Sequence, residues 1–308
     1  MTDAGLRARL AGRLAFAAPA TAPVIEVLET AARPGYAEQR VVFAGAEGPV
    51  PAYLLVPEER AAPVPGVVVH HQHHSQWHWG KSEVAGRVGD PLQALGPALA
   101  RRGLAVLAPD AVGFEDRRAT GPGTDPRHDD RLQHLDEMAY RLVEGRLLMT
   151  TVLRDAAAAL SAIAGHPAVD AGAVGVAGHS FGGNTTLFHA ALDERVRFAA
   201  ASGAACTYRR RMADRTPLEL AQVVPGILAL ADIDDVVALV APRPLLLVSA
   251  PGDRYSADAD AIQRAVAERF PPGALRHARF DGGHALTEER LALIVDWLAE
   301  TAAGAAAS

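Results

Sequence analysis

The stretch from Val174 to Gly183 holds a serine whose surroundings suit nucleophilic catalysis. It reads Val-Gly-Val-Ala-Gly-His-Ser-Phe-Gly-Gly, an apolar run of strand character that enters a G-x-S-x-G motif. A serine hydroxyl is a poor nucleophile at neutral pH, so it must stand clear of its neighbours and have a general base nearby. The motif glycines permit a sharp turn, and the helix predicted over Asn184 to Leu192 directs free N–H groups at a developing oxyanion. Ser180 is therefore the predicted nucleophile.

Two later loops offer the base and the acid that such a serine needs. The apolar run Pro244–Ala250 has the length of a strand and is followed by a Pro-Gly turn that ends at Asp253. The run His277–Phe280 leads through Asp-Gly-Gly to His284. Parallel strands end at the same edge of a sheet, so residues that follow them can converge. His284 is the predicted base and Asp253 the carboxylate that orients it. Weaker candidates for the acid are Asp110, Glu115, Asp232, Asp234 and Asp235.

The buried-looking run Gly66–Val69 breaks into a polar loop that is suited to bind an oxyanion. One expected donor is the backbone N–H of Phe181, directly after the nucleophile. The second is expected to be the N–H of Gln72 or of His73 in this loop.

The same loop contains histidines at positions 70, 71, 73, 74 and 78, and this cluster makes a metal-dependent hydrolase the alternative to consider. Imidazole is a common zinc ligand, but the spacing matches no H-E-x-x-H motif and includes no carboxylate. We therefore expect neither a metal nor a cofactor. Trp77, Trp79 and His179 are candidate substrate-binding residues, although the tryptophans suit packing beneath the loop equally well.

Composition limits the range of partners. The 308 residues are 49% hydrophobic, enough for one large domain, and the net charge of −6 argues against nucleic acid as a partner. The only basic run, Arg209–Arg211, is interpreted as a solvated face of a lid. The single cysteine, Cys206, excludes an internal disulfide and is expected to be buried, and no uninterrupted apolar segment suggests a membrane span or signal peptide. We expect a cytoplasmic enzyme with a small-molecule ester as its partner, and a homo-oligomer remains open.

Apolar periodicity predicts a mostly parallel, doubly wound α/β sheet of eight strands flanked by helices. The expected strands cover 40–43, 52–56, 67–71, 105–108, 173–177, 198–202, 245–249 and 278–280, the first two forming an antiparallel pair. The main expected helices cover 92–102, 141–164, 184–192, 258–270 and 287–301. Residues 1–35 are predicted as a helical extension, 36–303 as a single domain and 304–308 as a frayed tail. Segments 113–140 and 205–242 fit the alternation poorly and are predicted to be cap insertions.

Taken in order, these motifs resemble the α/β-hydrolase superfamily, and the branch they are most similar to is that of dienelactone hydrolases and acetyl xylan esterases. The resemblance covers about 50–299 and rests on Gly-His-Ser-Phe-Gly-Gly, Ala-Pro-Arg-Pro at 241–244, the Gly-Asp that ends at 253 and Gly-Gly-His at 282–284. Further elements are His-Gln at 71–72 leading to Gly-Lys-Ser-Glu at 80–83, and Ala-Pro-Asp at 108–110 with Gly-Phe at 113–114. It implies Ser180 as nucleophile, Asp253 as acid and His284 as base. Dienelactone hydrolases proper use cysteine, so the serine favours a carboxylesterase.

The function predicted from these residues is cleavage of a carboxylic ester through an acyl-enzyme. The same triad could serve a thioesterase, lactonase, peptidase or carbon–carbon hydrolase. Two alternatives of another class are a metal-dependent hydrolase that uses the histidines at 70–78 and a catalytically silent binding protein with this fold.

Overall fold

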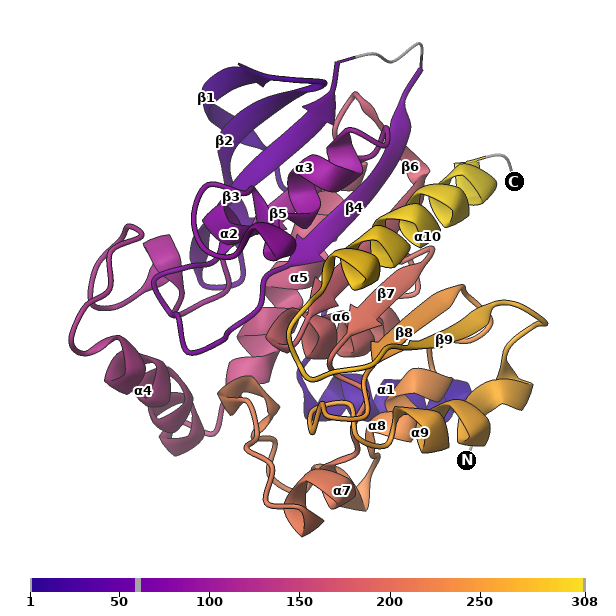
Figure 1. The fold of residues 1–308 in the computed structure, drawn as a ribbon. Helices are drawn as coiled ribbons and strands as arrows, with labels where there is room; N and C mark the ends of the chain where they lie inside the picture. Colours follow the sequence, from indigo (N-terminus) through magenta and orange to yellow (C-terminus); the bar gives the residue numbers. More distant parts are fainter. Residues whose placement is uncertain (1, 59–61, 307–308) are drawn as a thin grey trace.

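The computed structural model describes residues 2–58 and 62–306 and contains a twisted nine-stranded sheet with helices on both faces (Figure 1). The spatial order is β1-β2-β3-β5-β4-β6-β7-β8-β9, in which β1, β2, β3 and β5 pair antiparallel and every pair from β5 to β9 is parallel. The predicted doubly wound fold is confirmed. The strands are β1 (Glu26–Arg33), β2 (Tyr36–Gly45), β3 (Gly48–Pro57), β4 (Val64–His70), β5 (Ala105–Pro109), β6 (Val169–His179), β7 (Ala199–Ser202), β8 (Leu245–Ser249) and β9 (Leu275–Arg279).

The central strands are short apolar runs because both of their faces are covered. One face packs against the helices at 148–164, 181–192, 233–238 and 259–266, together with the N-terminal helix, whose Leu6, Leu10 and Leu14 lie in that core. The other face packs against two helices, with Leu99 and Trp297 in its core. The helices of eight or more residues are α1 (Asp3–Arg13), α4 (Asp130–Val143), α5 (Leu148–Ala164), α6 (Phe181–Leu192), α9 (Ala259–Val266) and α10 (Glu288–Ala306), and shorter ones include α2 (Lys81–Val84), α3 (Leu95–Ala100), α7 (Tyr208–Ala213) and α8 (Ile233–Ala238).

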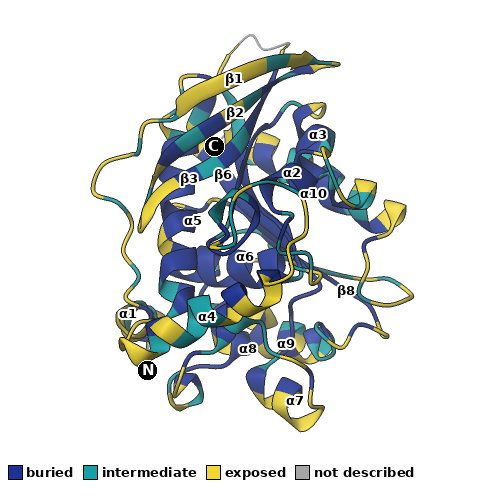
Figure 2. Cartoon of the chain, turned by 90° about the vertical axis from the view of Figure 1, so that its left-hand side faces the viewer, coloured by how far each residue is buried: buried dark blue, intermediate teal, exposed yellow. Residues whose placement is uncertain are grey.

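The predictions of eight strands and of a helical extension over residues 1–35 were wrong. Among the described residues of that segment only Asp3–Arg13 are helical, and Glu26–Arg33 form β1, the strand that was not predicted. This strand lies at the edge of the sheet, and its first five residues are exposed (Figure 2). Because neither face is buried there, the sequence shows no alternation of apolar and polar residues.

Helix boundaries also differ from the prediction. The single helix expected over 141–164 is two helices, α4 and α5, separated at Gly145, whose φ of 74° ends α4 in a left-handed turn. The helix expected over 92–102 is a 3₁₀ turn, Pro91–Gln93, followed by α3. In the predicted frayed tail, residues 304–306 instead continue α10, while 307–308 lie outside the described residues.

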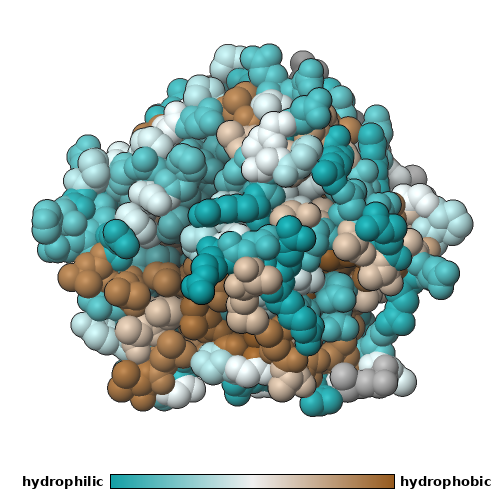
Figure 3. Space-filling view, turned by 60° about the horizontal axis from the view of Figure 1, so that its bottom comes forward, coloured by the Kyte–Doolittle hydropathy of each residue, from teal (hydrophilic) through white to brown (hydrophobic). Residues whose placement is uncertain are grey.

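The two predicted cap insertions contain short elements joined by irregular chain. The segment 113–140 holds the 3₁₀ turn Glu115–Arg117 and most of α4, and the segment 205–242 holds α7, the 3₁₀ turns Leu220–Gln222 and Ile227–Ala229, and α8. Figure 3 turns the lower side of Figure 1 toward the viewer and shows apolar side chains gathered there. The exposed apolar residues of α4 are Leu132, Leu135, Tyr140 and Val143.

Within the described residues, no single helix combines the length and apolar character needed to cross a bilayer. In this part of the chain α4 and α5 reach that length and composition when taken together, and they are bent by 104° at their junction.

Candidate active site

Ser180 lies on a sharp turn between β6 and α6, in a backbone conformation that serine rarely adopts. Its φ is 58° and its ψ is −116°. The turn depends on the neighbouring glycines, because a Cβ on Gly182 would lie 2.0 Å from the His70 carbonyl oxygen and one on Gly178 would lie 2.4 Å from the Gly182 carbonyl carbon. The Ser180 N–H donates to the Ser202 carbonyl at 2.8 Å, which fixes the turn to β7. The strained turn presents the hydroxyl clear of its neighbours.

The structure brings Ser180, His284 and Asp253 into one hydrogen-bonded chain. His284 Nε2 lies 2.8 Å from Ser180 Oγ, and His284 Nδ1 lies 2.9 Å from Asp253 Oδ1. The Asp253 carboxylate is buried, whereas the His284 side chain remains 23% exposed. The arrangement leaves Nε2 able to accept the serine proton while the carboxylate holds Nδ1–H.

The loops that carry the acid and the base are fixed to each other and to α10. Gly252 N–H donates to the Gly282 carbonyl at 2.9 Å. The buried guanidinium of Arg290 donates to three carbonyls of the base loop, those of Asp281, Gly283 and Ala285, at 2.7–2.8 Å. Arg290 therefore fixes the loop of His284 to α10.

Hydrogen bonding keeps Asp253 ionised. Burial alone would raise the pKa of its carboxyl, but hydrogen bonds from His284, from the Ser256 hydroxyl and from the Tyr255 N–H outweigh burial and lower that pKa below its usual range. The carboxylate is thus charged at neutral pH, as an orienting acid must be.

His179 does not face the substrate side, contrary to its prediction as a substrate-binding residue. Its side chain is buried behind the base, with ring centroids 4.8 Å apart between His179 and His284. Its Nδ1 lies 3.0 Å from Ser202 Oγ. Burial and the neighbouring His284 lower the pKa of His179 to about 3, so the ring stays neutral. Because the His179 ring stays neutral, it packs against His284 without repelling the positive charge that His284 gains when it takes a proton.

Gly203 is the spacer that lets both rings approach. Its φ is 63°, and a Cβ there would lie 2.8 Å from His179 Cε1 and 2.9 Å from His284 Cε1. We expect Gly203→Ala to displace His284 and to lower kcat by about 100-fold, since small misplacements of catalytic groups cost that much. Steady-state ester hydrolysis measures the effect. Gly273→Ala is the matched control, because Gly273 also has a positive φ, 80°, but has open space around it. Equal rates for both variants would contradict a steric role for Gly203.

His71 orients the peptide between Gln72 and His73, which carries one of the two N–H groups predicted as the second oxyanion donor. Its Nε2 accepts from Ala111 N–H at 3.1 Å, so Nδ1 carries the proton and donates to the Gln72 carbonyl at 2.7 Å. Burial lowers the pKa of His71 to about 4, which keeps this tautomer neutral. In a trans peptide the next N–H points opposite to the carbonyl, so the N–H of His73 points away from the His71 ring.

The two residues proposed for this donor differ in their surroundings. The His73 side chain lines the cavity above Ser180, whereas the Gln72 amide is buried and donates to the Glu83 carboxylate at 3.1 Å. The assignment of the oxyanion donors to Phe181 and to either Gln72 or His73 stays a prediction.

The loop histidines do not converge on one point. His70 contacts His189, with 3.3 Å between ring nitrogens, His71 binds the Gln72 carbonyl and His78 packs on Trp79. His74 is exposed at the rim of the catalytic cavity. Within the described residues, His73 is the one histidine of this loop whose ring belongs to a group of three possible metal ligands, together with one imidazole and one carboxylate from elsewhere in the chain.

Lys81, the only lysine in the sequence, anchors the far end of this loop. Its buried ammonium contacts three carboxylates, at 2.8 Å from Asp110, 2.8 Å from Asp116 and in contact with Glu115. Burial alone would lower the pKa of Lys81, but Asp110 and Glu115 raise it, so the ammonium is charged. The competing carboxylates Asp110 and Glu115 therefore stabilise the loop and lie away from the triad, and Asp232 caps α8.

A cavity of about 670 Å³ opens above the triad. A second, larger cavity of about 1030 Å³ adjoins it and shares His73, Ser75, Leu218 and Glu219 with it. Trp77 lines the second cavity, while Trp79 is not among the described residues that line either one. Residues of the catalytic cavity outside the triad include His73, His74, Asn184, Gly203, Arg211, Glu219 and Tyr255.

Arg211 was wrongly predicted to lie on a solvated lid face with Arg209 and Arg210. It is only 2% exposed and lines the catalytic cavity, because it faces inward from α7. Its guanidinium donates to the Gln222 side chain at 2.8 Å and to the Asn184 side chain at 3.2 Å. The positive charge of Arg211 is therefore stabilised by uncharged oxygen acceptors at the wall of the cavity.

Several residues of the site gave no signal in the sequence. Arg290 lies in an ordinary amphipathic helix, and Arg211 lies in the short helix α7, whose packing depends on residues far along the chain. Local patterns identify catalytic loops, but they do not identify the side chains that other elements send into them.

Comparison with known proteins places the chain among esterases. Residues 34–217 match the acetyl xylan esterase (AXE1) family model. YtaP of Bacillus subtilis (strain 168), named as a hydrolase, is 27% identical over 216 residues, which are 67% of this chain and 66% of that protein.

Solved structures show the same fold at low sequence identity. Acetyl xylan esterase 1 of Thermoanaerobacterium sp. superposes with a TM-score of 0.63 at 18% identity, covering 97% of this chain and 93% of that chain. A glucuronoyl esterase of Solibacter usitatus gives a TM-score of 0.63 at 17% identity, covering 96% of this chain and 92% of that chain.

Proposed function

Because the chain belongs to the acetyl xylan esterase family and is an ester hydrolase with a serine nucleophile, we propose that it removes small acyl groups from the hydroxyls of a carbohydrate. The observation that carries this proposal is the chain of hydrogen bonds from Ser180 through His284 to Asp253, which lies beneath an open cavity. This geometry suits acyl transfer to a serine.

The proposed reaction runs through an acyl-enzyme. His284 Nε2 takes the proton of Ser180 as its oxygen attacks the ester carbonyl, and the imidazolium that forms is stabilised by Asp253. The N–H groups of Phe181 and of Gln72 or His73 hold the oxyanion. His284 then protonates the leaving alkoxide, and later it activates the water that releases the acid.

Polar side chains in the wall of the cavity support a hydroxyl-rich alcohol. Asn184, Arg211, Glu219 and Tyr255 offer donors and acceptors on the wall, and His74 and Ser75 do so at the rim. Sugar hydroxyls can make the hydrogen bonds that water makes with such groups, so their binding costs little free energy. A long alkyl chain would leave these groups without partners. We infer that specificity resides in the alcohol part of the substrate.

A matched pair of substrates tests the proposal. We expect acetate release from O-acetylated xylo-oligosaccharides and none measurable from N-acetylated amino sugars, because the amide is a much poorer acyl donor for the same triad. Acetate is measured by a coupled enzymatic assay with wild-type protein. Release from the amide, or turnover confined to thioesters, lactones or carbon–carbon substrates, would contradict the ester assignment.

A further inference from the structure

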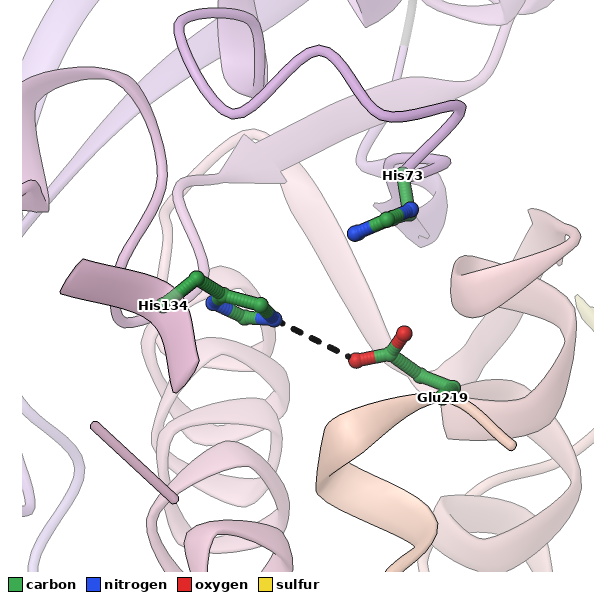
Figure 4. Close-up of side chains that lie close together, drawn as sticks. All are labelled: His73, His134 and Glu219. Carbon is green, nitrogen blue, oxygen red and sulfur yellow. Dashed lines mark hydrogen bonds and ion pairs between the residues drawn. The ribbon is translucent and has the colours of Figure 1, made fainter. Parts of the chain in front are cut away.

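Three side chains of types that can bind metals come from distant parts of the chain and meet beside the catalytic cavity. His73 comes from the loop after β4, His134 from α4 and Glu219 from the start of the 3₁₀ turn Leu220–Gln222 (Figure 4). One donor atom from each lies within 4.8 Å of the others. His134 Nε2 is already 3.4 Å from Glu219 Oε1.

The protein by itself leaves these groups poorly satisfied. His134 is buried, and its Nε2, the nitrogen that faces the cluster, makes a long 3.4 Å contact with Glu219, while its Nδ1 lies on the other side of the ring, near Gly113. Besides His134, the Glu219 carboxylate accepts a 3.3 Å bond from Ala221 N–H, and its only ion pair in the described chain is with His134. Polar groups inside a protein normally have closer partners than these. The Glu219 carboxylate, which is half-buried, can therefore accept a further positively charged partner.

The donor set is one that Zn²⁺ uses, and Fe²⁺ also binds this combination. Two imidazoles and one carboxylate form a zinc set with a position left open for water. Zinc–ligand distances of about 2.0–2.1 Å require donor atoms roughly 3.3 Å apart, which His134 and Glu219 already meet. His73 lies on a partly exposed loop, and its donor atom, within 4.8 Å of the other two, has to move closer to complete the set. Its Nδ1 accepts from Ser75 N–H at 3.2 Å, so Nε2 is the available ligand, and binding would exchange that contact for a protonated Nδ1.

We propose that His73, His134 and Glu219 together bind one Zn²⁺. The other acidic group that could hold a metal, Asp110 with Glu115 and Asp116, surrounds the Lys81 ammonium and has no such vacancy. The zinc site goes beyond the proposed esterase function, because no step of the triad reaction passes through it.

The site joins the two cap insertions to the oxyanion loop. His134 belongs to the segment 113–140, Glu219 to the segment 205–242, and His73 to the loop that was predicted to supply an oxyanion N–H. A bound ion would hold all three at the border between the two cavities, which His73 and Glu219 both line. Zinc would thus fix the shape of the substrate entrance.

Calorimetric titration of the chelator-treated full chain with Zn²⁺ tests the site. We expect about one Zn²⁺ per chain, and an increase of at least about 100-fold in the dissociation constant for both Glu219→Gln and His73→Gln, since even outer-shell changes cost 10–100-fold. His128→Gln is the matched control, because His128 is an exposed histidine of the same insertion. Co²⁺ titration should give a visible absorption spectrum in wild type that neither ligand variant produces.

Folding and catalysis are checked separately. Zn²⁺ should raise the melting temperature of wild type and of His128→Gln but not that of Glu219→Gln, whose metal-free melting temperature shows whether it folds. Ser180→Ala should bind Zn²⁺ as tightly as wild type while lacking turnover, so the two proposals can fail independently. Unchanged affinity in the two ligand variants, or equal loss in His128→Gln, would overturn the zinc site.

Discussion

Ser180→Ala should lower kcat for p-nitrophenyl acetate by about 10⁶-fold, because the variant loses the atom that attacks the carbonyl while the rest of the site remains. The hydroxyl lies 2.8 Å from His284 Nε2 on a turn that only glycine neighbours permit. The remaining rate would come from the oxyanion donors and from binding alone. Initial rates measure the effect, and a fluorophosphonate probe should label wild type but not the variant.

Ser161→Ala is the control for this experiment. Ser161 is a buried serine of α5 whose hydroxyl donates to the Ala157 carbonyl at 2.9 Å, away from the triad, so its variant should keep its activity and its labelling. Activity that survives in Ser180→Ala but is abolished by EDTA would refute the triad mechanism and move the chemistry to a metal. Absence of labelling in wild type would favour a catalytically silent binding protein.

Lys81→Met should reduce the free energy of unfolding by about 3–5 kcal/mol, since removing one partner of a buried ion network leaves uncompensated charge. Without the ammonium, the negative charges of Asp110, Glu115 and Asp116 would repel one another. Urea denaturation followed by circular dichroism measures it. Ester hydrolysis should fall as well, because the same carboxylates bind the N–H groups of Gly80 and Lys81 and so fix the end of the oxyanion loop.

Arg102→Met provides the comparison on the surface. Arg102 pairs with Asp296 at 2.5 Å, but both side chains are about half exposed, so water screens the pair and its loss should cost less than about 1 kcal/mol. If both variants unfold at the same urea concentration, the buried network contributes no more than a surface pair does.

The convergence of Ser180, His284 and Asp253 could be predicted because each follows a recognisable strand. The strand at 245–249 was predicted with the bounds that the structure shows, and β6 turns at the glycines of the motif. Loops after parallel strands meet at one edge, so identifying the strands was enough to bring the three residues together.

What the sequence did not reveal depends on contacts between distant segments. β1 lies at an exposed edge and has no buried face to mark it, whereas the break between α4 and α5 was signalled by Gly145 and was missed. His134 and Glu219 are 85 positions apart and meet only because the two insertions pack against the same loop. Arg211, in a run of three arginines, is turned inward by acceptors on α6 and near β8 that no local pattern indicates.

The burial of Lys81 also determines what kind of positive charge the protein shows to solvent. Every other basic side chain among the 30 lysines and arginines is a guanidinium, and those at the surface stay protonated well above the pH at which a lysine amine loses its proton. Alkaline solutions that neutralise lysine-rich surfaces should therefore leave the cationic side chains of this one unchanged. In the folded protein the Lys81 amine is buried among three carboxylates, so reagents that acylate lysine amines should not react with it. Acylation of Lys81 would therefore identify molecules that have unfolded at this site.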